Sequence, residues 1–360
     1  DVDGTPHKSN GGYVALVNDE GKYEGGVFST KVASDKWADG YTAVETDDGW
    51  TIKKAEYVAK IGDVGYATLA EATAAANNGD TITIIGKIAV AANDIPQNKT
   101  LTFEGQDETS ELDFSGAAAF GANNSNLTFK SLTINWGNLG DNNGGNYHGI
   151  QHSGDVLYED CTIKGRFNLY GKTETFRRCD FVQDVADYNL WTYGAGEATF
   201  DTCTFKGLGK AINVYKEGYE EGENTYKDLA VHKVIIKNCT FEASNGIGKA
   251  AIEINSELCP FDVTISESSA TGFSEGSTTG NTLYNIKKMR SDISDSKNDK
   301  TSLTVDNEKI DLEKIRKYNS TWTYDTDSGY FTVDGEKSGV MRFMFKITPQ
   351  ETIKEAGIKY

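Results

Sequence analysis

The sequence predicts an all-β chain folded as a right-handed parallel β-helix, a solenoid in which short strands stack coil upon coil. Three observations predict this fold: a recurring six-residue motif, a second alternating segment between its copies, and a helical pattern upstream of both. The same patterns predict a capping helix at the N-terminal end of the solenoid and a small α+β or β segment at the C-terminal end.

The recurring motif consists of an apolar residue, two polar residues, Cys or Leu, a polar residue, and Phe or Ile. Its five copies begin, with steps of 29, 18, 24 and 36 residues, at Phe129, Tyr158, Phe176, Phe200 and Ile236. A solenoid coil needs about 20 to 25 residues, so the longer steps indicate loops inserted at corners. The longest step contains the polar, glycine-bearing stretch 216–228, as an inserted loop should.

A second strand is predicted between the copies, in segments 149–154, 167–171, 190–194, 212–215 and 252–255. Apolar and polar residues alternate in most of these segments, which is typical of a strand with one buried face. Stacking in register places equivalent positions about 4.8 Å apart, so the inward residues form continuous apolar ladders.

The start of the solenoid is predicted from a capping box, Thr68-Leu-Ala-Glu71, which begins an alanine-rich helix ending near Ala76. The turn 77–80 follows, and the first strand begins at Thr81. We therefore expect three regions: a small N-terminal β repeat unit over 1–60, the β-helix over 61–298, and a C-terminal cap or the start of a following domain over 299–360. In the last region the patterns favour a helix over 311–318 and strands over 330–333 and 340–347.

Two segments carry a resemblance to known families. Residues 66–84 resemble the N-terminal cap of pectin-lyase-like β-helix domains, and residues 25–30 with 37–44 resemble a small repeat of large surface proteins from gut bacteria of the Firmicutes and Bacteroidetes type. The resemblance covers roughly residues 10–290 and implies an extracellular, cell-surface location and a chain that is a piece of a longer exported protein. It implies no particular activity, because this fold carries lyases, hydrolases, esterases and adhesins.

The charge and composition of the chain limit the classes of partner that it can bind. The formal net charge is −18 and the isoelectric point about 4.7, so nucleic acid and anionic membranes are poor partners. No apolar run reaches the length needed to span a bilayer, and the first residues do not form a signal peptide. We expect a monomer without a cofactor. Calcium fits the acidity but is not required, because the acidic stretch Glu217, Glu220, Glu221, Glu223 and Asp228 lacks the spaced order of a calcium loop.

Four of the five cysteines, Cys161, Cys179, Cys203 and Cys239, occupy one position of the motif, and Cys259 stands apart. No Cys-x-x-Cys pair indicates zinc. In-register neighbours have parallel Cβ vectors about 4.8 Å apart, too wide for a disulfide. We therefore predict a ladder of reduced, buried thiols.

Catalytic groups are not apparent in the repeated strands. Lyases and polygalacturonase-like hydrolases of this fold use clustered carboxylates, but no pair of aspartates falls in a repeated strand. The stretch 179–203 superficially resembles pectin methylesterases, with Asp187 as the candidate carboxylate, yet the arginine motif and second aspartate strand of that family are missing. His148 and His152, four residues apart, could share a strand face and hold a metal or transfer protons; the alternative is one corner and one buried histidine. We expect neither a catalytic nor a metal site.

Aromatic side chains at outward positions form the predicted ligand-binding surface. Tyr170, Tyr193 and Tyr215 fall in one column, and Trp191 falls in the next column between Asn168 and Asn213. Gln151 and Glu253 extend the polar rim of this strip. Sugars bind such surfaces through ring faces, amides and carboxylates. The alternatives are that the rings stabilise the sheet, that they lie under loop 216–228, or that a shift of one residue turns them inward.

These observations favour a non-catalytic extracellular module for adhesion to, or binding of, a glycan or another host-surface ligand. One alternative is a carbohydrate-active enzyme: a lyase, glycoside hydrolase or esterase on a β-helix. A third possibility is a module that binds a host protein such as immunoglobulin or mucin, or a passive stalk.

Overall fold

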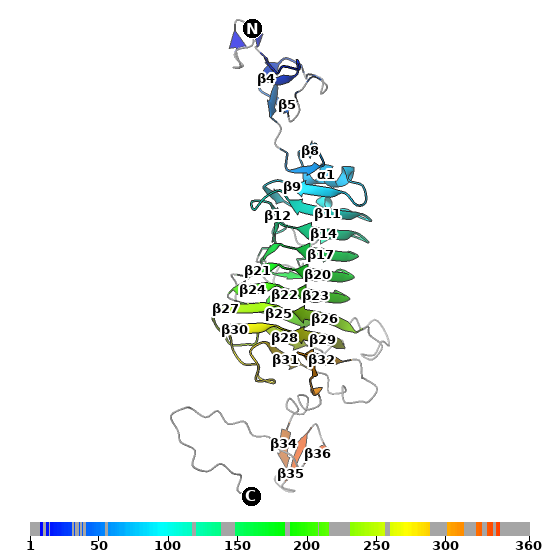
Figure 1. Ribbon diagram of the computed structural model, residues 1–360, viewed down its shortest axis with the longest axis vertical. Coiled ribbons are helices and arrows are strands. Elements are labelled where there is room, and N and C mark those ends of the chain that lie inside the picture. Colours follow the sequence, from blue (N-terminus) through cyan, green and yellow to red (C-terminus); the bar gives the residue numbers. More distant parts are fainter. Residues whose placement is uncertain are drawn as a thin grey trace.

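The protein is represented by a computed structural model, and the part of the chain described below comprises residues 8–9, 12–13, 15–30, 32, 36, 38, 41–54, 57–116, 120–137, 148–183, 188–207, 209–215, 231–255, 260–288, 301–312, 322–325, 330–333 and 336–338. The predicted all-β parallel β-helix is confirmed. Coils stack in chain order along the long axis of the molecule, as Figure 1 shows.

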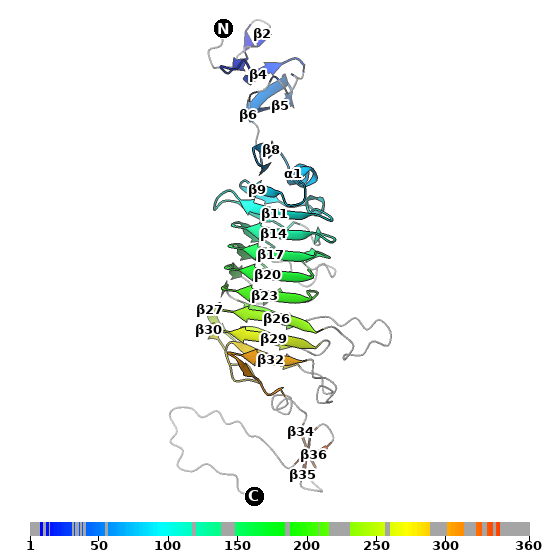
Figure 2. The same cartoon turned by 45° about the vertical axis from the view of Figure 1, so that its right-hand side comes forward.

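Three sheets run along the stack. Sheet I has twelve strands, in spatial order β33 (Glu308–Lys309), β32 (Ser302–Val305), β29 (Phe261–Ser266), β26 (His232–Lys237), β23 (Glu197–Asp201), β20 (Thr173–Arg177), β17 (Asp155–Glu159), β14 (Asn126–Lys130), β11 (Thr100–Gly105), β9 (Thr81–Ile84), β7 (Ala59–Ile61) and β8 (Val64–Tyr66). Neighbours from β9 to β32 pair in parallel, and the pairs made by β7, β8 and β33 are antiparallel. Figure 2 shows the strands of this sheet from β9 to β32 one below another.

Sheet II has eight parallel strands: β10 (Lys87–Ala89), β12 (Glu111–Asp113), β15 (Thr133–Asn135), β18 (Thr162–Lys164), β21 (Asp180–Gln183), β24 (Thr204–Gly207), β27 (Thr240–Ile247) and β30 (Ser269–Phe273). Sheet III has five: β19 (Phe167–Asn168), β22 (Tyr188–Trp191), β25 (Lys210–Tyr215), β28 (Ile252–Asn255) and β31 (Tyr284–Lys288). Each complete coil thus contributes one strand to each sheet. A shorter pair, β13 (Phe120–Gly121) with β16 (Ile150–Gln151), precedes sheet III.

The recurring motif forms the corner between sheets I and II. Its first residue is buried in sheet I, where the rings of Phe129, Tyr158, Phe176 and Phe200 stack with centroids 5.1, 4.5 and 5.1 Å apart. A single residue with positive φ then turns the chain, for example Asp160 at 53°. The last residue of the motif is buried in sheet II. The sequence pattern therefore encodes a bend as well as two inward positions.

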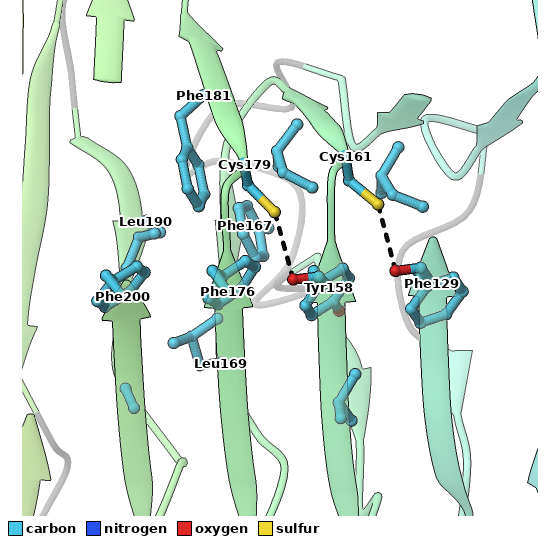
Figure 3. Packing of buried hydrophobic residues seen from close by; sticks show 14 of the residues in the cluster. Phe129, Tyr158, Cys161, Phe167, Leu169, Phe176, Cys179, Phe181, Leu190 and Phe200 are labelled. Carbon is cyan, nitrogen blue, oxygen red and sulfur yellow. Dashed lines mark hydrogen bonds between the residues drawn. The ribbon is translucent and has the colours of Figure 1, made fainter. Parts of the chain in front are cut away.

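The four motif cysteines are free and buried, which confirms the prediction for these residues. Figure 3 shows Cys161 and Cys179 on neighbouring coils, with their Sγ atoms 3.3 and 3.4 Å from the carbonyl oxygens of Phe129 and Tyr158. The hydrogen bond with Cys179 and burial both raise the pKa of Cys161, so this thiol stays protonated. Cys259 lies outside the described residues.

The predicted capping helix is α1 (Leu69–Ala75), with Thr68 as its N-cap and a complete capping box to Glu71. Leu69 and Ala72 are buried against the first coil. Lys99, from the next turn of the solenoid, donates to the carbonyl oxygens of Thr73, Ala74 and Ala76 at 2.7, 3.2 and 2.8 Å. One ammonium group therefore satisfies the C-terminal carbonyls that the helix leaves unpaired. A short 3₁₀ turn, η2 (Ala92–Asp94), follows β10.

Smaller antiparallel elements occur outside the stack. The N-terminal region contains β1 (Lys8–Ser9), β2 (Gly12–Tyr13), β3 (Leu16–Val17), β4 (Tyr23–Phe28), β5 (Tyr41–Thr46) and β6 (Gly49–Lys54), and the C-terminal region contains β34 (Trp322–Asp325), β35 (Tyr330–Val333) and β36 (Glu336–Ser338). Sheet I extends from β7 to β33, so the helical stack begins slightly before the expected residue 61 and continues past 298. The expected strand 340–347 and most of the expected helix 311–318 lie outside the described residues.

Candidate ligand-binding face

The strands of sheet III align the predicted site residues in two columns. In the first column the register pairs Asn168 with Trp191, Trp191 with Asn213, Asn213 with Glu253, and Glu253 with Asn285. The residues on either side of this column, such as Leu190 and Ile212, point into the apolar core. The first column therefore lies on the outer side of the sheet, as the alternation predicts.

The tyrosines form the second column. The ring centroids of Tyr170 and Tyr193 lie 5.6 Å apart, and those of Tyr193 and Tyr215 lie 5.9 Å apart. Trp191 joins this column through an edge contact of 5.6 Å with Tyr215, and it makes a second edge contact of 5.6 Å with Tyr188. These five rings form one continuous cluster, which we call the aromatic face; four of them are partly exposed, and Tyr188 is buried beneath them.

Gln151 lies at the N-terminal end of the tyrosine column. The Asn168 N–H donates to the His148 carbonyl oxygen at 2.7 Å, which sets Gly149 beside Asn168 in a parallel register. Gln151, two residues further, therefore lies level with Tyr170. Gly149 has φ of 143°, and a Cβ atom there would lie 2.1 Å from the Asn168 carbonyl oxygen, so only glycine allows this close approach.

Exposure separates the predicted residues into two layers. Tyr170, Trp191, Tyr193, Tyr215 and Gln151 are partly exposed. In contrast, the exposed fractions of Asn168, Asn213 and Glu253 are only 6%, 1% and 3%. These three side chains were expected on the rim of the strip, but they form a buried polar layer below the rings. Alternation gives the direction of a side chain and does not reveal whether other atoms cover it.

The buried polar layer is partly hydrogen-bonded. The Asn168 amide donates to the Tyr170 hydroxyl at 3.1 Å, and the Tyr188 hydroxyl donates to Glu253 at 2.9 Å. Within the described part of the chain, no partner is present for the buried Trp191 Nε1 and Asn213 Oδ1 atoms. Leaving a buried polar atom unpaired costs about 1 to 3 kcal/mol. In this layer the Trp191 indole N–H can still donate a hydrogen bond, and the Asn213 amide oxygen can still accept one.

Two cations and one tyrosine of this face were not predicted. The Arg166 guanidinium lies 6.0 Å from the centroid of the Trp191 ring, and the Lys210 ammonium lies 4.3 Å from that of Tyr188. Both are cation–π contacts. The strand register pairs Tyr188 with Lys210 and so brings the tyrosine ring and the lysine ammonium together. The sequence signal was available, since Tyr188 and Lys210 lie two residues before the predicted segments 190–194 and 212–215 and so fall at equivalent positions.

Glu174 supports the aromatic face from inside the solenoid. Its Oε1 atom accepts hydrogen bonds from the backbone N–H groups of Tyr170 and Gly171 at 2.7 and 2.8 Å. Its in-register neighbours on sheet I are Val156 and Ala198, and burial raises the pKa of this carboxyl to about 7. An acidic side chain at an otherwise apolar inward position thus anchors the turn that follows Tyr170.

The other candidate groups do not assemble into a site. His148 is buried, which lowers its pKa, whereas His152 is exposed at a positive-φ turn, so the two histidines do not share a face. No group of three or more metal-ligating side chains is present among the described residues. Asp187 and the acidic stretch 217–228 lie outside them. No helix in the described part is long and apolar enough to cross a membrane.

Comparisons with known proteins add little. No family model matches the chain, and no curated protein matches it. A crystal structure of the pectin methylesterase from Aspergillus niger, in its deglycosylated form, matches with 13% identity over 80% of this chain and 96% of that chain, at a TM-score of 0.32. The fold of the present chain follows from its own sheets and registers.

Proposed function

We propose that this chain is an extracellular, cell-surface module that binds a glycan on the aromatic face without turning it over. The observation that carries the proposal is the continuous surface of Tyr170, Tyr193, Tyr215 and Trp191, all partly exposed and linked by ring contacts of 5.6 to 5.9 Å. Flat aromatic rings contact the C–H faces of sugars, and their hydroxyl and indole N–H groups hydrogen-bond at the edges.

The polar groups around these rings suit a ligand rich in hydroxyl groups. Gln151 at one end of the tyrosine column and Asn255 at the other are partly exposed amides, which both donate and accept hydrogen bonds. Hydroxyl groups do the same, so amides and sugars pair in many orientations. This arrangement favours a glycan over a purely apolar ligand.

The binding role is favoured over catalysis by the state of the carboxylates. Glu253, the acidic residue of the first column, is 3% exposed and is already hydrogen-bonded by Tyr188. Glycoside hydrolysis in its usual form needs two carboxyl groups that reach one glycosidic bond. Among the described residues of the aromatic face, no second carboxylate accompanies Glu253.

The test is binding of the purified chain to a broad glycan array, with and without calcium, with mass spectrometry of the same samples. Saturable retention of intact glycans is expected. Trp191→Ala and Tyr193→Ala should each weaken binding about tenfold or more, as expected for aromatic residues at the centre of a contact surface. Trp50→Ala, in the N-terminal sheet, is the matched control and should bind as the unchanged chain does.

Each other outcome assigns a different function. Shortened or unsaturated products would establish an enzyme and refute the non-catalytic role. Retention that survives both face substitutions would place the glycan elsewhere on the chain. Failure to retain any glycan would leave a host protein as ligand, or a passive stalk, and pull-downs from host secretions before and after removal of glycans would distinguish these.

A further inference from the structure

The outer face of sheet I carries three ladders of side chains that are set by the strand register. The central ladder consists of Thr81, Thr102, Thr128, Leu157, Thr175, Thr199, Ile235, Thr264 and Thr304. It contains no charged residue, and from Thr102 onward its members are partly exposed. A shallow hollow lies over its middle, lined in part by Thr128, Leu157 and Thr175.

Beside it runs the charge ladder, in which the sign alternates on six successive coils: Glu104, Lys130, Glu159, Arg177, Asp201 and Lys237. Neutral residues, Thr83 and Ser266, stand at its two ends. The third ladder, on the other side of the central one, consists of Thr100, Asn126, Asp155, Thr173, Glu197, Lys233, Asp262 and Ser302.

Contacts within one chain explain part of the alternation. Lys130 pairs with Glu104 at 2.8 Å, and Arg177 pairs with Glu159 at 3.3 Å. Such cross-strand pairs stabilise a sheet. The alternation continues, however, through Asp201 and Lys237, which no ion pair within 4 Å joins in the described part of the chain. Ion pairs within one chain therefore do not account for the whole alternation.

We propose that the outer face of sheet I binds a second copy of this chain, face to face, about a two-fold axis that runs parallel to the strands and passes between β17 and β20. Such an axis places each ladder of one copy against the same ladder of the other copy, with the order of the coils reversed. Glu104 then faces Lys237 of the second copy, Lys130 faces Asp201, and Glu159 faces Arg177. Every charge of the ladder meets its opposite, and each contact occurs twice because the interface is isologous.

The third ladder is compatible with the same axis. Reversal places Thr100 opposite Lys233, Asn126 opposite Glu197, and Asp155 opposite Thr173, so no like charges meet. A shift of the axis by half a coil would bring Lys130 opposite Arg177 and would place Glu159 opposite itself. Like charges in contact are strongly unfavourable, so the pattern excludes such half-coil shifts. A shift by a whole coil keeps opposite charges together but leaves Lys130 opposite the neutral Ser266, so the proposed axis is the one that pairs all six charges of the ladder.

Net charge and area also permit this association. The charge ladder sums to zero, and the third ladder has three acidic residues and one basic residue, so the face carries −2 of the −18 charges of the chain. About this axis the eight coils from β9 to β29 overlap; at about 4.8 Å per coil and strands of about five residues they give a face of roughly 600 Å² per copy. The total of about 1,200 Å² lies at the lower limit of specific interfaces, so a weak, reversible dimer is expected.

The test is sedimentation of the full chain, and of two single charge reversals, Lys130→Glu and Asp201→Lys. The unchanged chain should shift from 39.2 kDa toward twice that mass as its concentration rises into the micromolar range. Each variant alone places like charges at two contacts and should dimerise about tenfold less tightly or worse. An equimolar mixture of the two variants restores opposite charges at both contacts, so heterodimers should form where neither variant associates alone.

The mixing experiment distinguishes a specific interface from a nonspecific effect of changing the net charge of the chain. Asp180→Lys, a charge reversal on sheet II, is the control: it leaves the face unchanged, so it should dimerise by itself as the unchanged chain does. It should bind Lys130→Glu less tightly than Asp201→Lys does, because one contact still places the substituted glutamate at position 130 opposite Asp201. An unchanged chain that remains monomeric at all concentrations would overturn the proposal. So would a dimer that neither reversal weakens, or variants whose mixture fails to associate. Circular dichroism of each variant would verify that its fold is retained. The sequence predicted a monomer, so this proposed dimer departs from that expectation.

Discussion

Replacing Glu174 with glutamine is expected to remove a pH dependence of the folding stability. The Glu174 side chain is almost completely buried among apolar neighbours, and burial raises its pKa from 4.5 to about 7 even though two backbone N–H groups donate to it. The folded chain therefore favours the neutral acid over the carboxylate at pH values where the unfolded chain is already ionised.

The direction and the size of this pH dependence follow from proton linkage. A carboxyl group whose pKa is higher in the folded chain binds more protons when folded, so the free energy of unfolding falls as pH rises. The fall begins near pH 4.5 and is complete above about pH 7. A difference of about 2.5 pKa units corresponds to about 3 kcal/mol. Glutamine is neutral throughout, so relative to the unchanged chain the variant should gain about this amount across the window.

The assay is urea unfolding at a series of pH values from 4 to about 8, followed by tryptophan fluorescence. Two of the five tryptophans, Trp136, which stacks on Phe167, and Trp191, lie in coils near Glu174. Other titrating groups are shared by both chains and cancel in the difference. Lys172→Gln, at an exposed position of the same turn, is the matched control and should keep the pH dependence of the unchanged chain. Parallel stability curves for Glu174→Gln and the unchanged chain would refute the reasoning.

Three further substitutions test the packing of the solenoid. Lys99→Met removes the three hydrogen bonds to the end of α1 and should lower the local stability of this helix by about 2 kcal/mol. Amide exchange should become faster over residues 69–76 and stay unchanged in the rest of the chain. Phe176→Ala removes a ring stacked on both Tyr158 and Phe200 and should cost about 4 kcal/mol in urea unfolding; a cost below about 1 kcal/mol would contradict the packing. Thr202→Asn replaces a β-branched residue at φ 59° and should stabilise the fold by about 1 kcal/mol, seen as a higher thermal midpoint. A lower midpoint would show that the hydrogen bonds of the Thr202 hydroxyl with Asp201 and Asn238 matter more.

Much of the architecture could be predicted because the motif repeats. The alternation around Phe176 and the spacing of its copies specify inward positions without any knowledge of coil geometry. The cap helix was equally accessible, since Thr68 and Glu71 form a local capping box. Strand β32 (Ser302–Val305) lies within the region 299–360 that was expected to be a C-terminal cap or a following domain, and it pairs in parallel with β29 of the stack.

The candidate site was less accessible to sequence reasoning. The columns of Tyr170 and Trp191 follow from period-two alternation, but the burial of Asn213 and Glu253 depends on atoms that cover the sheet from outside. Aligning the motif copies could have revealed Glu174, because it occupies the position held by Val156 in the preceding coil. The Tyr188–Glu253 hydrogen bond joins residues far apart in the sequence and needed the register of three strands.

The cysteine column has a consequence for how such a chain reaches its folded state. In the solenoid, Cys161, Cys179, Cys203 and Cys239 are each inaccessible to solvent oxidants, and the coil spacing keeps neighbours from bonding. In the unfolded chain nothing holds them apart, so an oxidising compartment would trap mispaired disulfides. In such a compartment, stacking of the coils would have to be faster than oxidation, and the folded thiols would then remain reduced because the surrounding core shields them.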